Sequence, residues 1–170
     1  MKKLLSSIAL LITLAAPNAY AAELVTNLMT THVFESTFKD KETGERVKYN
    51  EENQMYSLWF DVELTEDERN RLDAGTQMKY GFGMFKDSFY NTGPIAGVVV
   101  EPRIKQYFVP VIGKFETYYG IGAIMTTTYE SMSFMPILIA HVGVRTETWS
   151  ANLGAYGMGA ALTANLGYHF

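Results

Sequence analysis

The sequence predicts an all-β fold: an eight-stranded antiparallel transmembrane β-barrel of the bacterial outer membrane. Three observations predict it. Residues 1–21 have the form of an export signal, and the chain after them divides into eight segments in which apolar and polar side chains alternate. The last segment, 160–170, closes on an aromatic residue, Phe170, which is typical of the terminal strands of bacterial outer-membrane proteins. Such a barrel turns its apolar face to lipid and its mixed face inward.

The N-terminal segment has the three parts of a secretory signal peptide. Two lysines start it, a run of apolar and small side chains follows, and Ala19 and Ala21 flank a cleavage site. We therefore expect residues 1–21 to be the signal peptide and residues 22–170 to be the outer-membrane β-barrel domain. No cysteine follows the cleavage site, so a lipoprotein attachment is not expected.

Residues 55–64 show the alternation most clearly. Their apolar face carries Tyr56, Leu58, Phe60, Val62 and Leu64, and their mixed face carries Met55, Ser57, Trp59, Asp61 and Glu63. A period of two over this length predicts a strand with two different faces. The alternation alone also fits a soluble sandwich, and the export signal and the terminal strand favour the barrel.

The predicted strands follow one another along the chain. They are 23–34, 55–64, 76–87, 94–108, 115–127, 136–145, 148–156 and 160–170. Pro102 predicts a bulge or an early end in the fourth strand, because proline has no N–H for the ladder. The polar residues 35–54 predict a long loop, and the charged residues 65–75 predict a connection with room for one helical turn. An even number of strands brings both termini to the periplasmic side.

Composition excludes several functions. The formal net charge of −4 provides no basic surface for nucleic acid. The absence of cysteine excludes disulfides, thiolate metal sites and a cysteine nucleophile. His141 and His169 have no second ligand at a suitable spacing, so no metal site is expected. Charged residues on inward faces predict a polar network inside a filled barrel without an open pore: Asp61, Glu63, Lys79, Glu101 and Arg145.

Three polar residues fall at the outer end of the predicted barrel. The first strand ascends and ends near His32, and the third strand ascends and ends near Asp87 and Ser88. A histidine, an aspartate and a serine are residue types that activate a hydroxyl by general-base catalysis. The same residues also fit a second interpretation, in which all three are solvated loop residues.

Two sequence blocks lie next to this rim. Residues 85–88 (FKDS) are followed, after five residues, by residues 94–97 (PIAG). His32 precedes residues 49–51 (YNE), and residues 133–138 (SFMPIL) form a proline-marked strand start. This arrangement resembles the lipid A palmitoyltransferase family PagP. The similarity extends from His32 to the C-terminus, and the FKDS and PIAG pair is its specific part.

The resemblance implies an enzyme. Members of this family move a palmitoyl chain from a phospholipid to lipid A and use no cofactor. By resemblance, His32, Asp87 and Ser88 match the catalytic residues. We therefore expect membrane lipids as partners, no nucleic acid, and a monomeric protein in the bacterial outer membrane.

The resemblance also implies an acyl-chain pocket and a lipid entry route. The family measures its acyl chain with a small residue near the PIAG block, and Val99, beside Gly97, is the candidate for that place here. A bulkier valine implies a chain shorter than palmitate. The family admits lipid sideways at prolines that interrupt strand hydrogen bonding, and Pro136 keeps such a position.

Two other functions remain open from the sequence. The first is a non-catalytic small outer-membrane barrel that acts in adhesion, surface masking or envelope integrity, with residues 35–54 as its working surface. The second is a narrow channel or transporter, against which a filled eight-stranded interior argues.

Overall fold

The computed structural model describes residues 22–33, 37–40, 42–51, 54–72, 75–87, 89–111, 113–127, 135–157 and 161–170. The predicted signal peptide, residues 1–21, lies outside the described residues, and so does Ser88.

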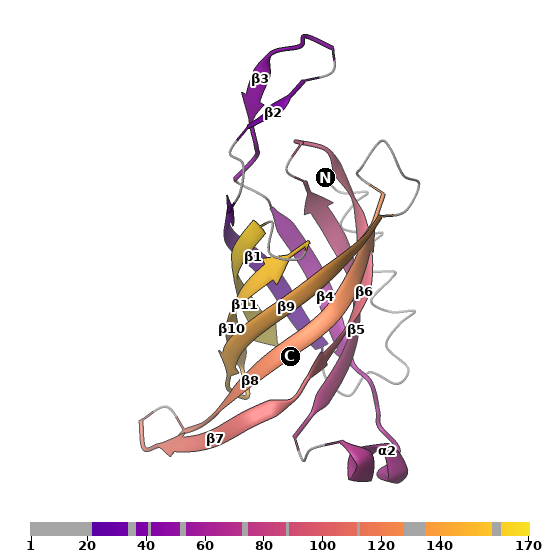
Figure 1. Ribbon diagram of the computed structural model, residues 1–170. Helices are drawn as coiled ribbons and strands as arrows, with labels where there is room; N and C mark the ends of the chain where they lie inside the picture. The colour runs from indigo at the N-terminus through magenta and orange to yellow at the C-terminus, as the bar shows by residue number, and fades with distance from the viewer. Residues whose placement is uncertain are drawn as a thin grey trace.

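In the described part of the chain, eight antiparallel strands close into a barrel, which confirms the predicted fold class (Figure 1). The order around the barrel is β6-β5-β4-β1-β11-β10-β9-β8, and pairing of β8 with β6 closes it. The strands are β1 (Ala22–His32), β4 (Met55–Asp61), β5 (Gln77–Lys86), β6 (Thr92–Glu101), β8 (Gly113–Thr126), β9 (Met135–Arg145), β10 (Trp149–Tyr156) and β11 (Ala161–His169). Closure leaves no free sheet edge along the barrel wall.

The segment predicted as a long loop contains a hairpin, so that expectation is wrong for part of it. Strands β2 (Thr37–Lys39) and β3 (Arg46–Lys48) pair with each other and extend beyond one end of the barrel (Figure 1). Three-residue strands are too short to show a period. Asp40 Oδ1 accepts hydrogen bonds from the Thr43 N–H at 2.7 Å and the Glu42 N–H at 2.9 Å. The Thr43 bonds lower the pKa of the Asp40 carboxyl.

A short helix occupies the opposite end of the barrel. The charged connection after β4 contains α2 (Glu66–Arg71), and Thr65 caps its N-terminus in a reciprocal pair with Glu68. In the part of the chain that the structure describes, no helix is long and apolar enough to cross a membrane. Strand β4 ends before Glu63, which is exposed, so the inward position predicted for Glu63 is wrong. The two ends are named below the β2–β3 end and the α2 end.

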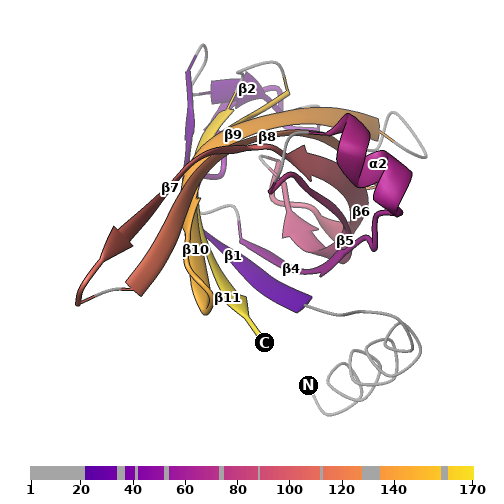
Figure 2. The same ribbon diagram turned by 90° about the horizontal axis from the view of Figure 1, so that it is seen from below.

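The strand predicted over 94–108 is broken in two. Strand β6 ends directly before Pro102, and β7 (Arg103–Val109) begins directly after it. Pro102 donates no hydrogen bond to a ladder, which is the reason for the predicted break at this residue. Strand β7 pairs only with β8 among the described strands and projects away from the barrel (Figure 2). The single long strand was therefore wrong, and its breakpoint was right.

The barrel interior has two layers. The half toward the β2–β3 end is an apolar core of Val25, Met55, Trp59, Ile95, Val99, Ile124, Ile137 and Ile139, with Phe85 and Tyr156 packed against it. The half toward the α2 end holds buried charged and polar side chains, among them Glu23, Lys79, Glu101, Arg145 and Ser150. Polar atoms in such a layer are stable only when they are paired.

Candidate functional site

His32 is the last residue of β1, at the β2–β3 end. Its imidazole stacks on the ring of Tyr49, with centroids 4.6 Å apart and an interplanar angle of 20°. Phe38 of β2 and Phe89 of the β5–β6 loop complete the contact, because each of them lies against Tyr49 and they meet each other at 4.8 Å. These four residues form a rim cluster that packs the β2–β3 hairpin onto the barrel.

Asp87 follows β5 at the same end and is fully buried. Its Oδ1 accepts hydrogen bonds from the backbone N–H groups of Phe89 at 2.9 Å and Asn91 at 2.8 Å. Its own N–H donates to the Asn91 carbonyl at 2.8 Å. Within this tight loop Tyr90 takes a left-handed conformation with φ of 69°, which is costly for a non-glycine residue. The Asp87 carboxylate therefore orders the loop between β5 and β6.

Asn50 joins the His32 side of the rim to the Asp87 side. Its Nδ2 donates to the backbone carbonyl of Asp87 at 3.1 Å, and both residues are buried. Its neighbour Tyr49 stacks on His32, and Glu51 interacts electrostatically with the same imidazole. Residues 49–51 were only a supporting part of the predicted motif. The structure uses them as the bridge between two segments that are distant in sequence.

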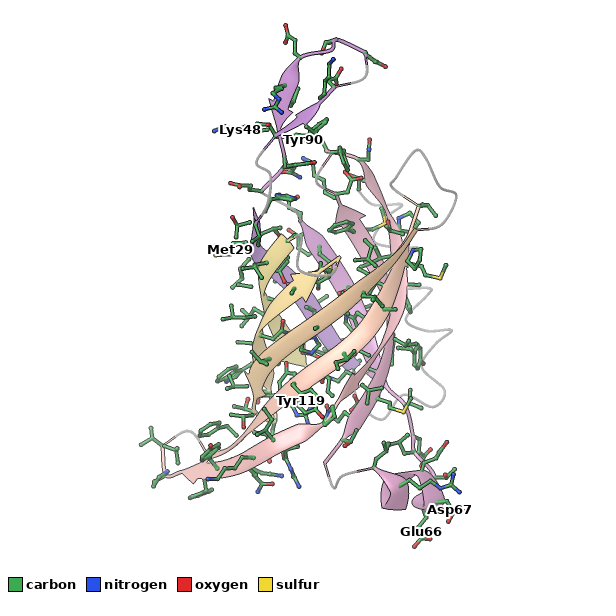
Figure 3. The ribbon with its side chains drawn as sticks, in the orientation of Figure 1. Met29, Lys48, Glu66, Asp67, Tyr90 and Tyr119 are labelled. Carbon is green, nitrogen blue, oxygen red and sulfur yellow. The ribbon has the colours of Figure 1, made fainter. Side chains whose placement is uncertain are left out.

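A second contact ties the hairpin to the β5–β6 loop. The hydroxyl of Tyr90 donates to the backbone carbonyl of Lys48 at 3.4 Å, and both residues lie where the hairpin joins the barrel (Figure 3). Of the predicted catalytic residues, His32 and Asp87 thus flank one cluster at one end of the barrel. Ser88 is adjacent to Asp87 in sequence and lies outside the described residues.

The two predicted pocket residues lie on β6, below this rim. Val99 is buried in the apolar core, as its inward position in the alternation predicts, and it pairs with Lys79 of β5. It therefore lies where the apolar layer meets the charged layer. Gly97 pairs with Ile124 of β8, and a side chain added at Gly97 would lie 2.7 Å from Cγ2 of Ile124. The space beside Gly97 is already filled.

A small cavity marks the boundary between the two layers. Its volume is about 40 Å³, and its apolar lining consists of Val25, Met55, Trp59, Val99, Ile139 and Tyr156. Its polar lining includes Lys79, Glu101 and His141. This volume accommodates no more than a few water molecules. A hydrocarbon chain can enter from the rim only if apolar side chains move, and Met55 is the most flexible of them.

The charged layer is a continuous network. Lys79 Nζ lies 2.7 Å from Glu23 and 3.0 Å from Glu101, and His141 Nε2 lies 2.9 Å from Glu101. Arg145 is 3.2 Å from Glu101 through its Nη1. The network joins β1, β5, β6 and β9 across the lumen and fills the interior at the α2 end, as the inward charges predicted.

The barrel wall is incompletely paired at the β2–β3 end. Among the described residues, β1 pairs with β4 only from Ala22 to Thr26, and a bulge follows at Asn27. Pro136, the predicted entry residue, is exposed, lies second in β9 and pairs with Met125 of β8. It has no N–H to donate to a neighbouring strand. The wall is therefore weakest where the rim cluster lies, and the loss of pairing after Thr26 carried no proline signal in the sequence.

The outer surface of the barrel is apolar on every strand. Each barrel strand presents at least one exposed large apolar side chain, for example Leu24, Tyr56, Met84, Val98, Ile121, Leu138, Leu153 and Leu166. Soluble monomeric proteins rarely expose apolar patches beyond a few hundred square ångströms. Exposed aromatic residues gather toward the α2 end, namely Tyr80, Tyr107, Tyr119, Trp149, Tyr168 and Phe170.

No group of three His, Asp or Glu side chains that could hold a metal ion occurs among the described residues. No protein-family model matches the sequence, and no curated protein matches it significantly.

Proposed function

We propose that this chain is an outer-membrane acyltransferase that moves an acyl chain from a phospholipid to lipid A. One observation carries the proposal: the segments that hold His32, residues 49–51 and Asp87 converge at one end of the barrel, directly above the apolar half of its interior. A polar reaction centre above an apolar interior suits a substrate with a polar ester and a hydrocarbon chain.

Membrane placement is part of this proposal. The apolar outer surface on all eight strands, with aromatic residues gathered at the α2 end, is the pattern of a lipid-facing barrel. In this orientation the rim cluster lies at the outer leaflet, where lipid A is located, and the α2 end faces the periplasm. The incompletely paired wall beside His32 and Pro136 offers a sideways route for lipid.

The chemistry assigned to the rim is a transesterification. His32 acts as the general base that takes a proton from the attacking hydroxyl, and Ser88 supplies a hydroxyl at the reacting centre. The ester C–O bond of the phospholipid breaks, an acyl bond to lipid A forms, and the proton passes to the departing alkoxide. Asp87 positions this centre through the loop that it orders.

Mass spectrometry of lipid A tests the proposal. Expression in a bacterium that lacks its own enzyme should add one acyl mass to lipid A, and His32→Ala and Ser88→Ala should lower that product by about 100-fold or more. His169→Ala is the matched control, because His169 lies at the α2 end and should leave the product unchanged. Absence of any acylated lipid A, or a product that persists in both rim variants, contradicts the proposal.

Chain length tests the pocket separately. We expect the transferred chain to be shorter than palmitate, because Val99 lies buried directly above the charged layer. The variant Val99→Gly should shift the product toward longer chains in the same mass spectra. A preference for palmitate that Val99→Gly leaves unchanged would reject this role of Val99.

A second function is favoured by one observation. The interior cavity is only about 40 Å³, and the β2–β3 hairpin presents exposed charged side chains beyond the barrel. Both fit a non-catalytic barrel whose outer hairpin contacts another surface. The lipid A spectrum decides between the two functions, since such a barrel adds no acyl mass. The filled interior also argues against a channel.

A further inference from the structure

The most unusual part of the barrel wall is a hairpin that leaves it. Strand β7 pairs with the first residues of β8, up to Tyr118, and the two strands project sideways from the α2 end (Figure 2). The other edge of β7 pairs with no described strand. This segment, residues 103–118, is called the β7–β8 hairpin below. Nothing in the rim chemistry uses it.

The outer part of the β7–β8 hairpin exposes large apolar side chains. Val111 is 95% exposed, Phe108 is 76% exposed and Ile104 is 62% exposed. Together with Tyr107 these residues make the projecting end apolar on both of its faces. Contiguous apolar surface of this kind marks a contact with a lipid or a protein partner.

The hairpin continues the outer surface of the barrel. Side chains alternate along β8, so Ile121, Tyr119 and Phe115 point to the same side, and Ile121 and Tyr119 are exposed on the barrel exterior. Phe115 pairs with Tyr107 across the hairpin, and their rings stack at 5.0 Å. The apolar outer surface therefore runs without interruption onto the hairpin, where it becomes aromatic.

Two lysines lie among these aromatic residues. Lys105 Nζ lies 5.1 Å from the centroid of the Tyr107 ring. Lys114 pairs with Phe108, and its side chain is about half exposed. Aromatic rings beside lysines are typical of the boundary between acyl chains and anionic headgroups, where the ring is buried and the amine reaches the phosphate.

The base of the hairpin is different from its tip. There Arg103 lies 3.0 Å from Glu116, which is also 3.1 Å from Arg145 of the interior network. The base is thus tied to the charged layer of the barrel, and the apolar tip is held away from it. This attachment gives the hairpin a defined direction.

We propose that the tip of the β7–β8 hairpin inserts into the periplasmic leaflet of the bilayer and contacts phospholipid. Phe108 and Val111 lie among acyl chains, and Lys105 and Lys114 contact headgroup phosphates. This inference rests on the membrane placement in the proposed function, and it does not depend on acyl transfer. Charge complementarity and the continuous apolar outer surface favour a lipid over a protein partner.

Site-directed spin labelling tests this contact, and the chain is suited to it because it contains no cysteine. Single variants Val111→Cys, Leu153→Cys and Asp67→Cys are labelled with a nitroxide after the barrel is folded into vesicles of phosphatidylcholine and phosphatidylglycerol. Leu153 lies on the exposed barrel exterior, and Asp67 lies on α2 at the same end as the hairpin (Figure 3). We expect the labels at 111 and 153 to be more accessible to oxygen than to a water-soluble nickel chelate, and the label at 67 to show the reverse.

The three labels separate the possible failures. A label at 111 that behaves like the label at 67, while 153 remains in lipid, overturns the insertion of the hairpin and leaves the membrane placement intact. A label at 153 that is accessible to the nickel chelate overturns the placement itself. The double variant Lys105→Gln and Lys114→Gln should make the label at 111 shallower and leave 153 unchanged. An unchanged depth at 111 overturns the contact of these lysines with phosphate.

Discussion

Replacing Arg145 by methionine should lower the free energy of unfolding by about 3–5 kcal/mol, because it leaves buried carboxylates without their counter-ion. Arg145 is almost completely buried and bonds to Glu101 at 3.2 Å and Glu116 at 3.1 Å. It also donates to Gln77 at 2.7 Å and to the carbonyl of Gly75 at 3.1 Å. One guanidinium therefore holds together the segment before β5 and strands β5, β6, β8 and β9.

Denaturant unfolding of the barrel in lipid vesicles measures this effect. The matched control is Arg103→Met, since Arg103 also pairs with Glu116, at 3.0 Å, but is partly exposed. An exposed pair contributes about 0–1 kcal/mol, so the control should change stability little. Equal losses in the two variants would show that burial does not decide the strength of this network. Adding Glu101→Gln to Arg145→Met should restore part of the stability, because one unpaired charge is removed.

Replacing Trp59 by alanine should cost about 3–5 kcal/mol and enlarge the interior cavity. Trp59 is buried in the apolar core, and its Nε1–H donates to Ser57 Oγ at 2.9 Å. Its indole lies over Gly81 of the neighbouring strand so closely that an added Cβ there would be 2.4 Å away. It also lines the 40 Å³ cavity beside Val99. The truncation therefore removes packing at the point where an acyl chain would end.

The second tryptophan of the chain is the control for this variant. Trp149 lies on the barrel exterior and is 40% exposed, so Trp149→Ala should lose much less stability than Trp59→Ala. The same pair of variants gives a functional readout in the lipid A mass spectra. Trp59→Ala should admit longer chains, and Trp149→Ala should not. Equal stability losses in the two variants would contradict the assignment of Trp59 to the core.

The pairing of strands could be predicted in outline because side-chain alternation is local. Met55 and Trp59 lie on the inward face that the alternation assigns, and Lys79, Glu101 and Arg145 are buried in a network as expected. A strand reverses direction at every residue, so the face of each side chain follows from its neighbours alone. The breakpoint at Pro102 was also local, since it depends on a single missing N–H.

The rim could be predicted only in part. The topology placed His32 and Asp87 at one end of the barrel, which the structure shows. It did not reveal that Tyr49 stacks on His32 or that Asn50 bonds to the Asp87 carbonyl. These contacts depend on the β2–β3 hairpin folding back onto the barrel, and strands of three residues leave no period to detect.

By itself, the sequence determined how many segments alternate, which side chains face inward and where one strand must end. Only the tertiary structure decided which partners meet. Lys79 contacts Glu23, 56 positions away in sequence, and Arg145 contacts Glu101, 44 positions away. It also decided that β7 leaves the wall with Phe108 exposed. The physical reason is that alternation is a property of neighbouring residues, whereas partners across a lumen depend on the register and closure of all the strands together.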